Sequence, residues 1–391
     1  MMLRAAAILI GALALLGLSG VSGMDRIART NPAIAAQVPM PFARAALRTL
    51  GNQALAGQRG SDAAAYGWYA LDRAPLEADA VALFAAGQLA SGKTAQAERA
   101  FGVAGRMGWR VPVTQAYWLS RALQTDDFAG AAMRLDALLR QQPTLIGQQA
   151  LLDQVERDPT ARAALVERLD PETEWLGRYL NEVFALPPQV LRQRALMMID
   201  AADAGLVLGC DRMSNLAGAM TNLNLYAEAA ALWDAQCPQS AGLLKGGDGF
   251  ATLNIQGTRN PFAWQVLGNG DLLLGLVPAP DQSGQRLTID GSPPIAERFL
   301  AKLLLLEPGR YRLSWRTGDN SGDQSEAIRA ALVCKGDERN RLEDQTPGTQ
   351  GRASALITIT PGCTAQQLSF ARAPGGSSSV WLEAVRLDPL P

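Results

Sequence analysis

The chain has 391 residues, of which 48% are hydrophobic, and a formal net charge of −1. A large buried core is therefore expected, and no general attraction to nucleic acid is implied. The sequence contains no histidine, which excludes Ser-His-Asp and Cys-His catalysis and removes the commonest metal ligand and general base. We predict a protein that is not an enzyme, uses no cofactor, holds no metal and binds no nucleic acid.

The first segment, residues 1–24, reads MMLRAAAILIGALALLGLSGVSGM, which is typical of a secretory signal peptide or an N-terminal transmembrane anchor. Arg4 precedes the uncharged stretch 5–23, which is long enough to cross a bilayer at ~1.5 Å per residue. The stretch 21–23, Val-Ser-Gly, resembles a small-residue cleavage site, so cleavage and retention both remain open. The positive-inside rule places the following chain outside the cytoplasm.

A helical repeat follows this segment. The stretch KTAQAERAFGVAGRMGW (93–109) aligns with DFAGAAMRLDALLRQQP (127–143) at an offset of 34 residues, so that Ala97 matches Ala131. A third copy, SDAAAYGWYALDRAP (61–75), fits upstream. This period, with a small residue where helices meet and a large residue one turn later, resembles the tetratricopeptide repeat.

The resemblance implies a tetratricopeptide-like α-solenoid over residues 25–240, because stacked helical pairs bury one continuous core. Such solenoids act as scaffolds that bind protein partners. The candidate partner contacts are Arg99, Arg106 and Arg121. Ordinary solvated helix surface is the alternative for each of them.

The pattern changes to short strands beyond PQSAGLLKGGDGF (238–250), a stretch rich in Pro, Gly and Ser. About nine alternating or β-branched runs follow, separated by turn residues. We predict an antiparallel jelly-roll β-sandwich over 241–391. The chain is thus expected to be a multidomain protein, α then β, with domains at 1–24, 25–240 and 241–391.

Three stretches of the strand region, NPFAW (260–264), LEPGRYRLSW (306–315) and VWLEAVRL (380–387), look like the galactose-binding-like jelly rolls that include many carbohydrate-binding modules. The order of membrane segment, helical repeats and sandwich resembles exopolysaccharide-associated tetratricopeptide-repeat proteins of sphingomonad-type bacteria. The resemblance implies a periplasmic protein, anchored to the inner membrane or released after cleavage. Its implied partners are polysaccharide assembly or export proteins and polysaccharide itself.

Tryptophans in the strand region are candidates for stacking on sugar rings, because an aromatic face matches the apolar face of a pyranose. Strand alternation offers core packing as the alternative for Trp264, Trp315 and Trp381. The loop TGDNSGDQSE (317–326) adds polar side chains, with an acidic turn of no dedicated role as its alternative. The candidate glycan contacts are Trp264, Asp319, Asn320 and Asp323.

Four cysteines divide into two pairs. Cys210 begins and Cys237 ends a predicted helical hairpin, so the two can meet the Cα separation of ~4.4–6.8 Å that a disulfide needs. Cys334 ends one predicted strand and Cys363 precedes another. We predict the disulfides Cys210–Cys237 and Cys334–Cys363 in an oxidising compartment, with unpaired buried thiols as the alternative. Two local cysteines without histidine do not support a zinc site.

The sequence therefore predicts a non-enzymatic, exported, membrane-anchored scaffold that mediates protein–protein interactions in exopolysaccharide assembly or export. The alternative is a polysaccharide-binding protein that acts through its terminal sandwich. A third hypothesis is a carboxylate-dependent polysaccharide-modifying enzyme, which the absence of histidine disfavours without excluding it.

Overall fold

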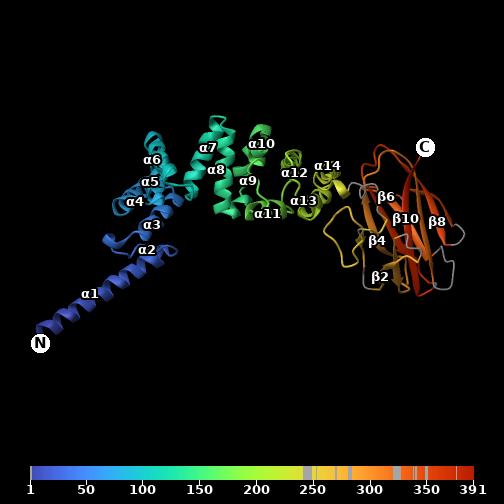
Figure 1. The fold of residues 1–391 in the computed structure, drawn as a ribbon, viewed down its shortest axis with the longest axis horizontal. Coiled ribbons are helices and arrows are strands. Elements are labelled where there is room, and N and C mark those ends of the chain that lie inside the picture. Colours follow the sequence, from blue (N-terminus) through green and yellow to red (C-terminus); the bar gives the residue numbers. More distant parts are fainter. Residues whose placement is uncertain are drawn as a thin grey trace. The chain divides into compact units, whose positions relative to one another are not determined.

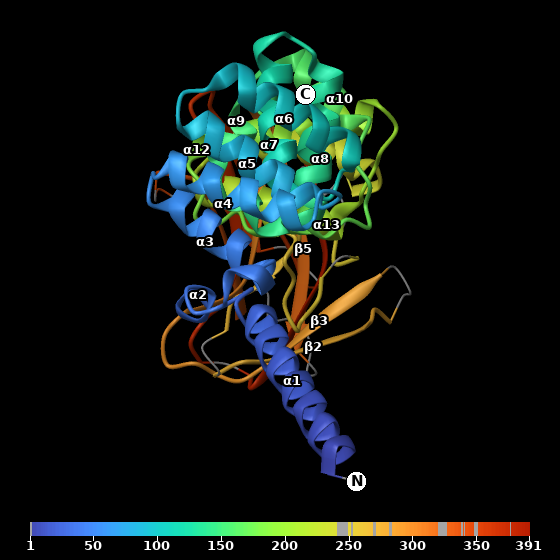
Figure 2. The same ribbon diagram turned by 90° about the vertical axis from the view of Figure 1, so that its left-hand side faces the viewer.

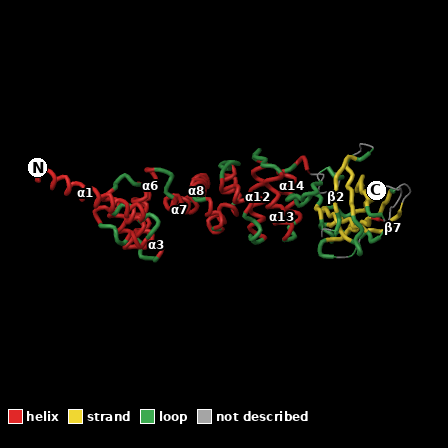
Figure 3. Tube along the Cα trace, turned by 90° about the horizontal axis from the view of Figure 1, so that it is seen from below, coloured by secondary structure: helices red, strands yellow, loops and turns green. Residues whose placement is uncertain are grey.

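The computed structural model is helical up to residue 236 and consists of strands and loops beyond it (Figures 1 and 3). It describes residues 2–391 apart from 241–248, 252, 269–270, 281–283, 320–326, 338, 340, 348–350 and 376, with side chains from residue 9 onward apart from 344–347. The chain divides into two compact units, Met1–Arg168 and Leu169–Pro391. The predicted order of an apolar helix, further helices and antiparallel sheets is confirmed.

The first helix, α1 (Met2–Ile27), projects as a single helix past α2 and α3 (Figure 2). Its segment Leu9–Ile27 is long and apolar enough to cross a membrane, and none of that segment is buried. The end of α1 is joined to the start of α3 (Ala45–Ala56) through Asp25. Its carboxylate accepts hydrogen bonds from the backbone N–H groups of Arg44, Ala45 and Ala46 at 3.0, 3.1 and 2.9 Å.

The rest of the first unit is built from short helices joined by tight turns. Their bounds are α2 (Pro32–Ala35), α3 (Ala45–Ala56), α4 (Gly60–Arg73), α5 (Ala78–Ala90), α6 (Thr94–Met107), α7 (Pro112–Gln124), α8 (Phe128–Gln141), α9 (Gln149–Arg157) and α10 (Pro159–Val166), with 3-10 turns at Met40–Phe42 and Pro143–Gly147. In the copies at 93–109 and 127–143 the small and large positions are buried: Ala97, Phe101, Ala131 and Leu135. In the copy at 61–75 Ala64 is buried, whereas Trp68, at the large position, is 58% exposed.

The helices α4 and α5 pack closely because glycines stand where they meet. A Cβ on Gly67 would lie 2.5 Å from the backbone nitrogen of Phe84, and one on Gly87 would lie 2.3 Å from that of Ala64. Real Cβ atoms do not approach backbone so closely, so larger residues would push the helices apart. The close packing of this pair therefore depends on the absence of side chains at two positions.

The second unit begins with four helices, α11 (Glu174–Asn181), α12 (Pro188–Asp203), α13 (Cys210–Asn222) and α14 (Tyr226–Gln236). The buried amide of Gln236 on α14 binds α12 and the loop that follows it. Its Nε2 donates to the carbonyls of Met198 and Leu206 at 2.6 and 3.2 Å, and its Oε1 accepts from the N–H of Leu208 at 2.7 Å. On α14, Trp233 packs edge-on against Phe262 with ring centroids 5.2 Å apart, which links the helices to the strand region.

Two antiparallel sheets make up the strand region, with orders β1-β4-β9-β6 and β2-β3-β10-β5-β8-β7. The strands are β1 (Gln265–Val266), β2 (Leu273–Pro278), β3 (Gln285–Asp290), β4 (Glu297–Leu304), β5 (Gly309–Asp319), β6 (Ile328–Cys334), β7 (Leu342–Pro347), β8 (Arg352–Ile359), β9 (Gln366–Arg372) and β10 (Ser379–Leu390). Apolar side chains of both sheets form one core. Near its centre, Phe370 packs against Trp264 and Trp315, each at 5.9 Å.

Candidate functional site

The outward face of the six-stranded sheet carries a row of charged side chains. Strand alternation turns Leu313 and Trp315 of β5 into the core, so the residues between and beside them face outward. The register pairs Glu383 of β10 with Arg286 of β3 and with Arg316 of β5, and Arg316 with Arg352 of β8. Directly paired residues share a face, so these four side chains form one row across four strands.

Beside this row stands Trp381, which is half-buried. It pairs with Thr288 on one side and Gly318 on the other. The guanidinium of Arg286 lies 3.9 Å from the centroid of its ring, a cation–π contact. An aromatic side chain is thus held next to the charged row, with a glycine as one neighbour.

Glu383 is the centre of the row and is only 1% exposed. Its Oε2 accepts from Arg286 Nε at 2.6 Å, and its Oε1 lies 3.0 Å from Arg316 Nη1. Removing a carboxylate from water is costly unless cations and hydrogen bonds compensate, and the two guanidiniums supply that compensation. Together the three side chains form a fixed, charged platform.

A bulge in β10 allows Glu383 to face outward while its neighbours stay in the core. The register with β5 shifts between Glu383 and Arg386, and Ala384 has φ +51°. The extra residue lets Leu382 and Val385 both reach the core, although an unbroken alternation would turn them to opposite faces.

The same face has more arginines than carboxylates among its described side chains. The register places six arginines outward: Arg286, Arg310, Arg312, Arg316, Arg352 and Arg386. It places four carboxylates there: Asp290, Glu343, Glu383 and Asp388. A surface of this kind favours hydroxyl-rich or acidic ligands, because guanidiniums donate paired hydrogen bonds in a fixed geometry.

The predicted glycan contacts lie elsewhere. Trp264 is 2% exposed, donates from Nε1 to the carbonyl of Gly249 at 2.5 Å and packs on Phe250 and Phe370, so a sugar ring cannot reach its faces. Trp264 is therefore a core residue, which is the alternative that strand alternation had offered to sugar binding. Asp319 is also buried, at the end of β5. Asn320 and Asp323 lie outside the described residues.

Sequence reasoning missed Arg286, Arg316 and Glu383. The alternation in VWLEAV (380–385), with Val380 and Leu382 apolar, indicates that Trp381 and Glu383 share the outward face. The pairing of Glu383 with arginines far away in the chain has no local signal.

The predicted partner contacts Arg99, Arg106 and Arg121 lie in the first unit, Met1–Arg168. Arg99 and Arg106 are exposed on α6. Arg121 of α7 forms an ion pair with Glu98 at 3.4 Å and lines a cleft of about 230 Å³ together with Trp118. The structure does not gather the three arginines into one described cleft.

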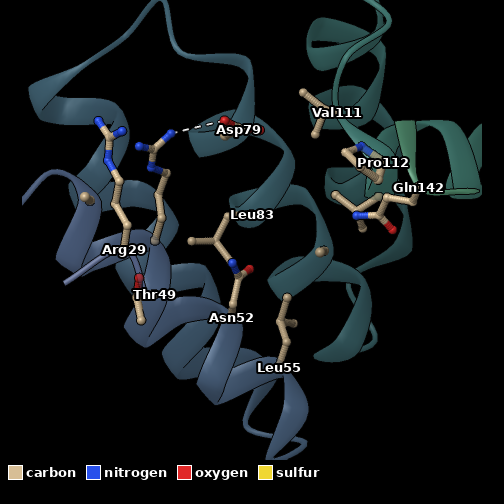
Figure 4. Close-up of a pocket in the computed structure, with 13 residues that line it drawn as sticks. Arg29, Thr49, Asn52, Leu55, Asp79, Leu83, Val111, Pro112 and Gln142 are labelled. Atoms are coloured by element: carbon tan, nitrogen blue, oxygen red, sulfur yellow. Dashed lines mark hydrogen bonds and ion pairs between the residues drawn. The ribbon is translucent and has the colours of Figure 1, made fainter. Parts of the chain in front are cut away.

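A larger groove of about 390 Å³ lies along α3, α5 and the start of α7 (Figure 4). Leu55, Leu83 and Val111 supply apolar lining. Arg48 of α3 forms ion pairs with Glu77 and Asp79 at 3.2 and 3.1 Å. The charge of Arg48 is therefore balanced by carboxylates of the same unit.

One of the two predicted disulfides is present. Cys334 and Cys363 are bonded, with Cα atoms 5.4 Å apart, and join the end of β6 to the turn before β9. Cys210 and Cys237 are free thiols, so the Cys210–Cys237 disulfide is not formed in this structure. The hairpin does bring the two thiols together, in a hydrogen bond and not in a covalent bond. Burial raises the pKa of the Cys237 thiol, and the hydrogen bond with Cys210 raises it further.

Metal-ligand types do not gather in the described part of the chain, where no three Cys, Asp or Glu side chains come close enough to hold an ion. One carboxyl does have a strongly changed pKa. Hydrogen bonds from the side chain and backbone of Arg339 lower the pKa of Asp337 to about 2. Asp337 is half-buried in the turn after β6, a strand of the four-stranded sheet, whereas Glu383 is on β10 of the other sheet.

No family model matches the chain, and no curated protein matches it. Three solved structures are similar to little more than a third of it. One is TmCBM61 in complex with β-1,4-galactotriose (16% identity, 36% of this chain, 94% of that chain, TM-score 0.24). Another is described as "CBM4 structure and function" (14%, 37%, 99%, 0.24). The third is the enzymatically active domain of bacteriophage CBA120 tailspike protein 4 (13%, 37%, 21%, 0.26). The structural neighbours of this chain thus include carbohydrate-binding modules, at a similarity too low to assign it a ligand.

Proposed function

We propose that this protein binds polysaccharide, without catalysing a reaction, on the outward face of its six-stranded sheet. The observation that carries the proposal is Trp381 standing beside the row Arg286–Glu383–Arg316. A half-buried indole offers an apolar face to a pyranose, while the guanidiniums donate hydrogen bonds to its hydroxyls. Because the row is already held by its own ion pairs, little side-chain ordering is needed on binding.

We also propose that the protein works in the periplasm, held at the inner membrane by α1. Two observations support this location: the uncovered apolar segment Leu9–Ile27 and the Cys334–Cys363 disulfide. Disulfides persist in oxidising compartments. A sandwich of jelly-roll type outside the cytoplasm would meet polysaccharide on its way to the cell surface.

The helical region is proposed as a tetratricopeptide-like solenoid that binds protein partners from polysaccharide assembly or export. The groove along α3 and α5 supports this second role, because it is large enough for the side chains of a peptide (Figure 4). In this proposal the helices hold partners and the sandwich holds polysaccharide.

A glycan array with the full chain in detergent tests the sandwich proposal. The informative variant is Arg352→Gln, which shortens the charged row at its exposed end, and the matched control is Arg329→Gln, an exposed arginine on β6 of the other sheet. We expect specific glycan signals that Arg352→Gln weakens and Arg329→Gln leaves unchanged. An array without specific signals, or equal losses in both variants, would contradict the proposal.

A further inference from the structure

A second hollow lies within the unit Leu169–Pro391, where α13 and α14 face β1, β4 and β9. Its volume is about 400 Å³, which is in the range of small-molecule sites, ~300–1,000 Å³. The helices supply one wall and the outward side of the four-stranded sheet supplies the other. This cleft is separate from the row of Arg286, Glu383 and Arg316, which lies on the other sheet.

The charge of this cleft has one sign. Arg259 and Lys335 line it and supply the charge, whereas the buried Lys302 has its Nζ 5.3 Å from the ring of the core residue Trp264. None of the described lining residues is an aspartate or glutamate. The chain has only four lysines, at 93, 245, 302 and 335, so two of them border this one cleft. The charges of Arg259 and Lys335 attract an anion.

The remaining lining suits a sugar ring. Tyr226 and Phe184 supply aromatic surface, and Phe184 is 62% exposed. The amide of Gln265 donates from Nε2 to the carbonyl of Asn260 at 2.7 Å, which leaves its Oε1 to accept from a ligand hydroxyl. Lys335 Nζ donates one hydrogen bond to Gln367 Oε1 at 2.8 Å. An ammonium has three donors, so two are left for a ligand.

We propose that this cleft binds a carboxylate-bearing sugar unit, a uronic acid, with the carboxylate between Arg259 and Lys335 and the ring against the aromatic wall. The charge selects a carboxylate, and the amides and aromatic rings select a pyranose over a bare anion. This site would give the protein a specificity for acidic glycans. The proposal does not depend on polysaccharide binding at the face bearing Trp381, so each of the two can be tested separately.

The test uses the scarcity of lysine. The full chain in detergent, labelled with [15N]lysine, gives at most four amide signals, and Lys93 at the start of α6 is an internal reference. The probes are methyl β-D-glucuronide, methyl β-D-glucoside, which lacks only the carboxylate, and inorganic sulfate. We expect the glucuronide to shift the Lys335 signal and to leave Lys93 unchanged, with little effect of the glucoside or of sulfate.

Two variants complete the test. Arg259→Gln is expected to weaken glucuronide binding about tenfold, since it removes a charge-assisted hydrogen bond. Arg329→Gln, an exposed arginine on β6, is expected to leave it unchanged. Equal shifts with glucoside or sulfate, an unmoved Lys335 signal, or equal effects of the two variants would each overturn the proposal. A loss of polysaccharide binding in the Arg352→Gln variant tests only the proposed site on the six-stranded sheet and not this cleft.

Discussion

The helical region and the sandwich carry the same arginine–tryptophan stack in different surroundings. Arg134 lies 3.8 Å from the ring centroid of Trp109, and Arg286 lies 3.9 Å from that of Trp381. In the helical region, Arg134 donates to Gln115 at 3.1 Å, and burial lowers the pKa of its guanidinium. On the sheet, the stack continues through a buried carboxylate into a row of charged side chains over four strands.

This difference teaches that the stack alone does not mark a binding surface. Helical arginines such as Arg48 and Arg178 are balanced by two carboxylates each. On the sheet, Arg286 and Arg316 both contact the buried carboxylate of Glu383 from neighbouring strands. The stack on the sheet is therefore part of a cluster that extends across strands, whereas the pairs of Arg178 stay within one helix.

The largest expected effect concerns the disulfide that only the sandwich has. Replacing Cys334 and Cys363 by serine removes a cross-link between residues 29 apart in sequence, which should lower the free energy of unfolding by about 3.5 kcal/mol in the chain-entropy model. The measurement is urea unfolding of the sandwich followed by tryptophan fluorescence. The control is the serine variant of Cys210 and Cys237, which are free thiols; an equal loss there would show that the helical pair is also bonded.

Next comes the carboxylate at the centre of the row. Glu383→Ala removes the buried carboxylate that both guanidiniums contact, which should destabilise the sandwich by about 3 kcal/mol. Asp388→Ala, an exposed carboxylate on the same strand, should change stability by less than about 0.5 kcal/mol. Thermal unfolding followed by near-UV circular dichroism measures both. Similar losses in the two variants would mean that the row is not a buried ionic cluster.

A smaller effect is expected at the junction of α1 with the helical region. Asp25→Ala removes the acceptor of three backbone N–H groups at the start of α3, which should cost about 1 kcal/mol. Hydrogen exchange of the amides of Ala45 and Ala46 should become faster. Asp62→Ala, an exposed carboxylate in the first turn of α4, is the control. Unchanged exchange in the Asp25 variant would show that α1 is not tied to α3.

The smallest effect is the titration of Asp337. Because Arg339 lowers its pKa to about 2, the carboxyl should stay ionised until the pH falls through about 2. A lowered carboxyl pKa stabilises the fold above the ordinary pKa of 3.8 and loses that contribution as the pH falls through the folded value. The side chain is partly exposed, at 27%, so solvent screens its ion pairs and the effect on stability is small. NMR titration should show the pKa rising in Arg339→Ala; an unchanged pKa would exclude the contact.

The order of helices and strands could be predicted from the sequence because it rests on local patterns. The 34-residue offset aligned the buried Ala97 with Ala131, and alternation identified β5 and β10. The charged row could not be predicted, because Arg286 and Glu383 are 97 residues apart and only the strand register joins them. Trp264 shows the opposite case: its residue type suggested a sugar contact, whereas its depth in the core depends on Phe250 and Phe370.

The most direct test compares the two stacked tryptophans by isothermal titration of the full chain with a polysaccharide identified on the glycan array. Trp381→Ala removes the aromatic face beside the row, and Trp109→Ala removes the equivalent face in the helical region. We expect at least about a tenfold loss of affinity, or ~1.4 kcal/mol, for Trp381→Ala and no change for Trp109→Ala. Equal affinities of wild type and Trp381→Ala would contradict polysaccharide binding at the six-stranded sheet.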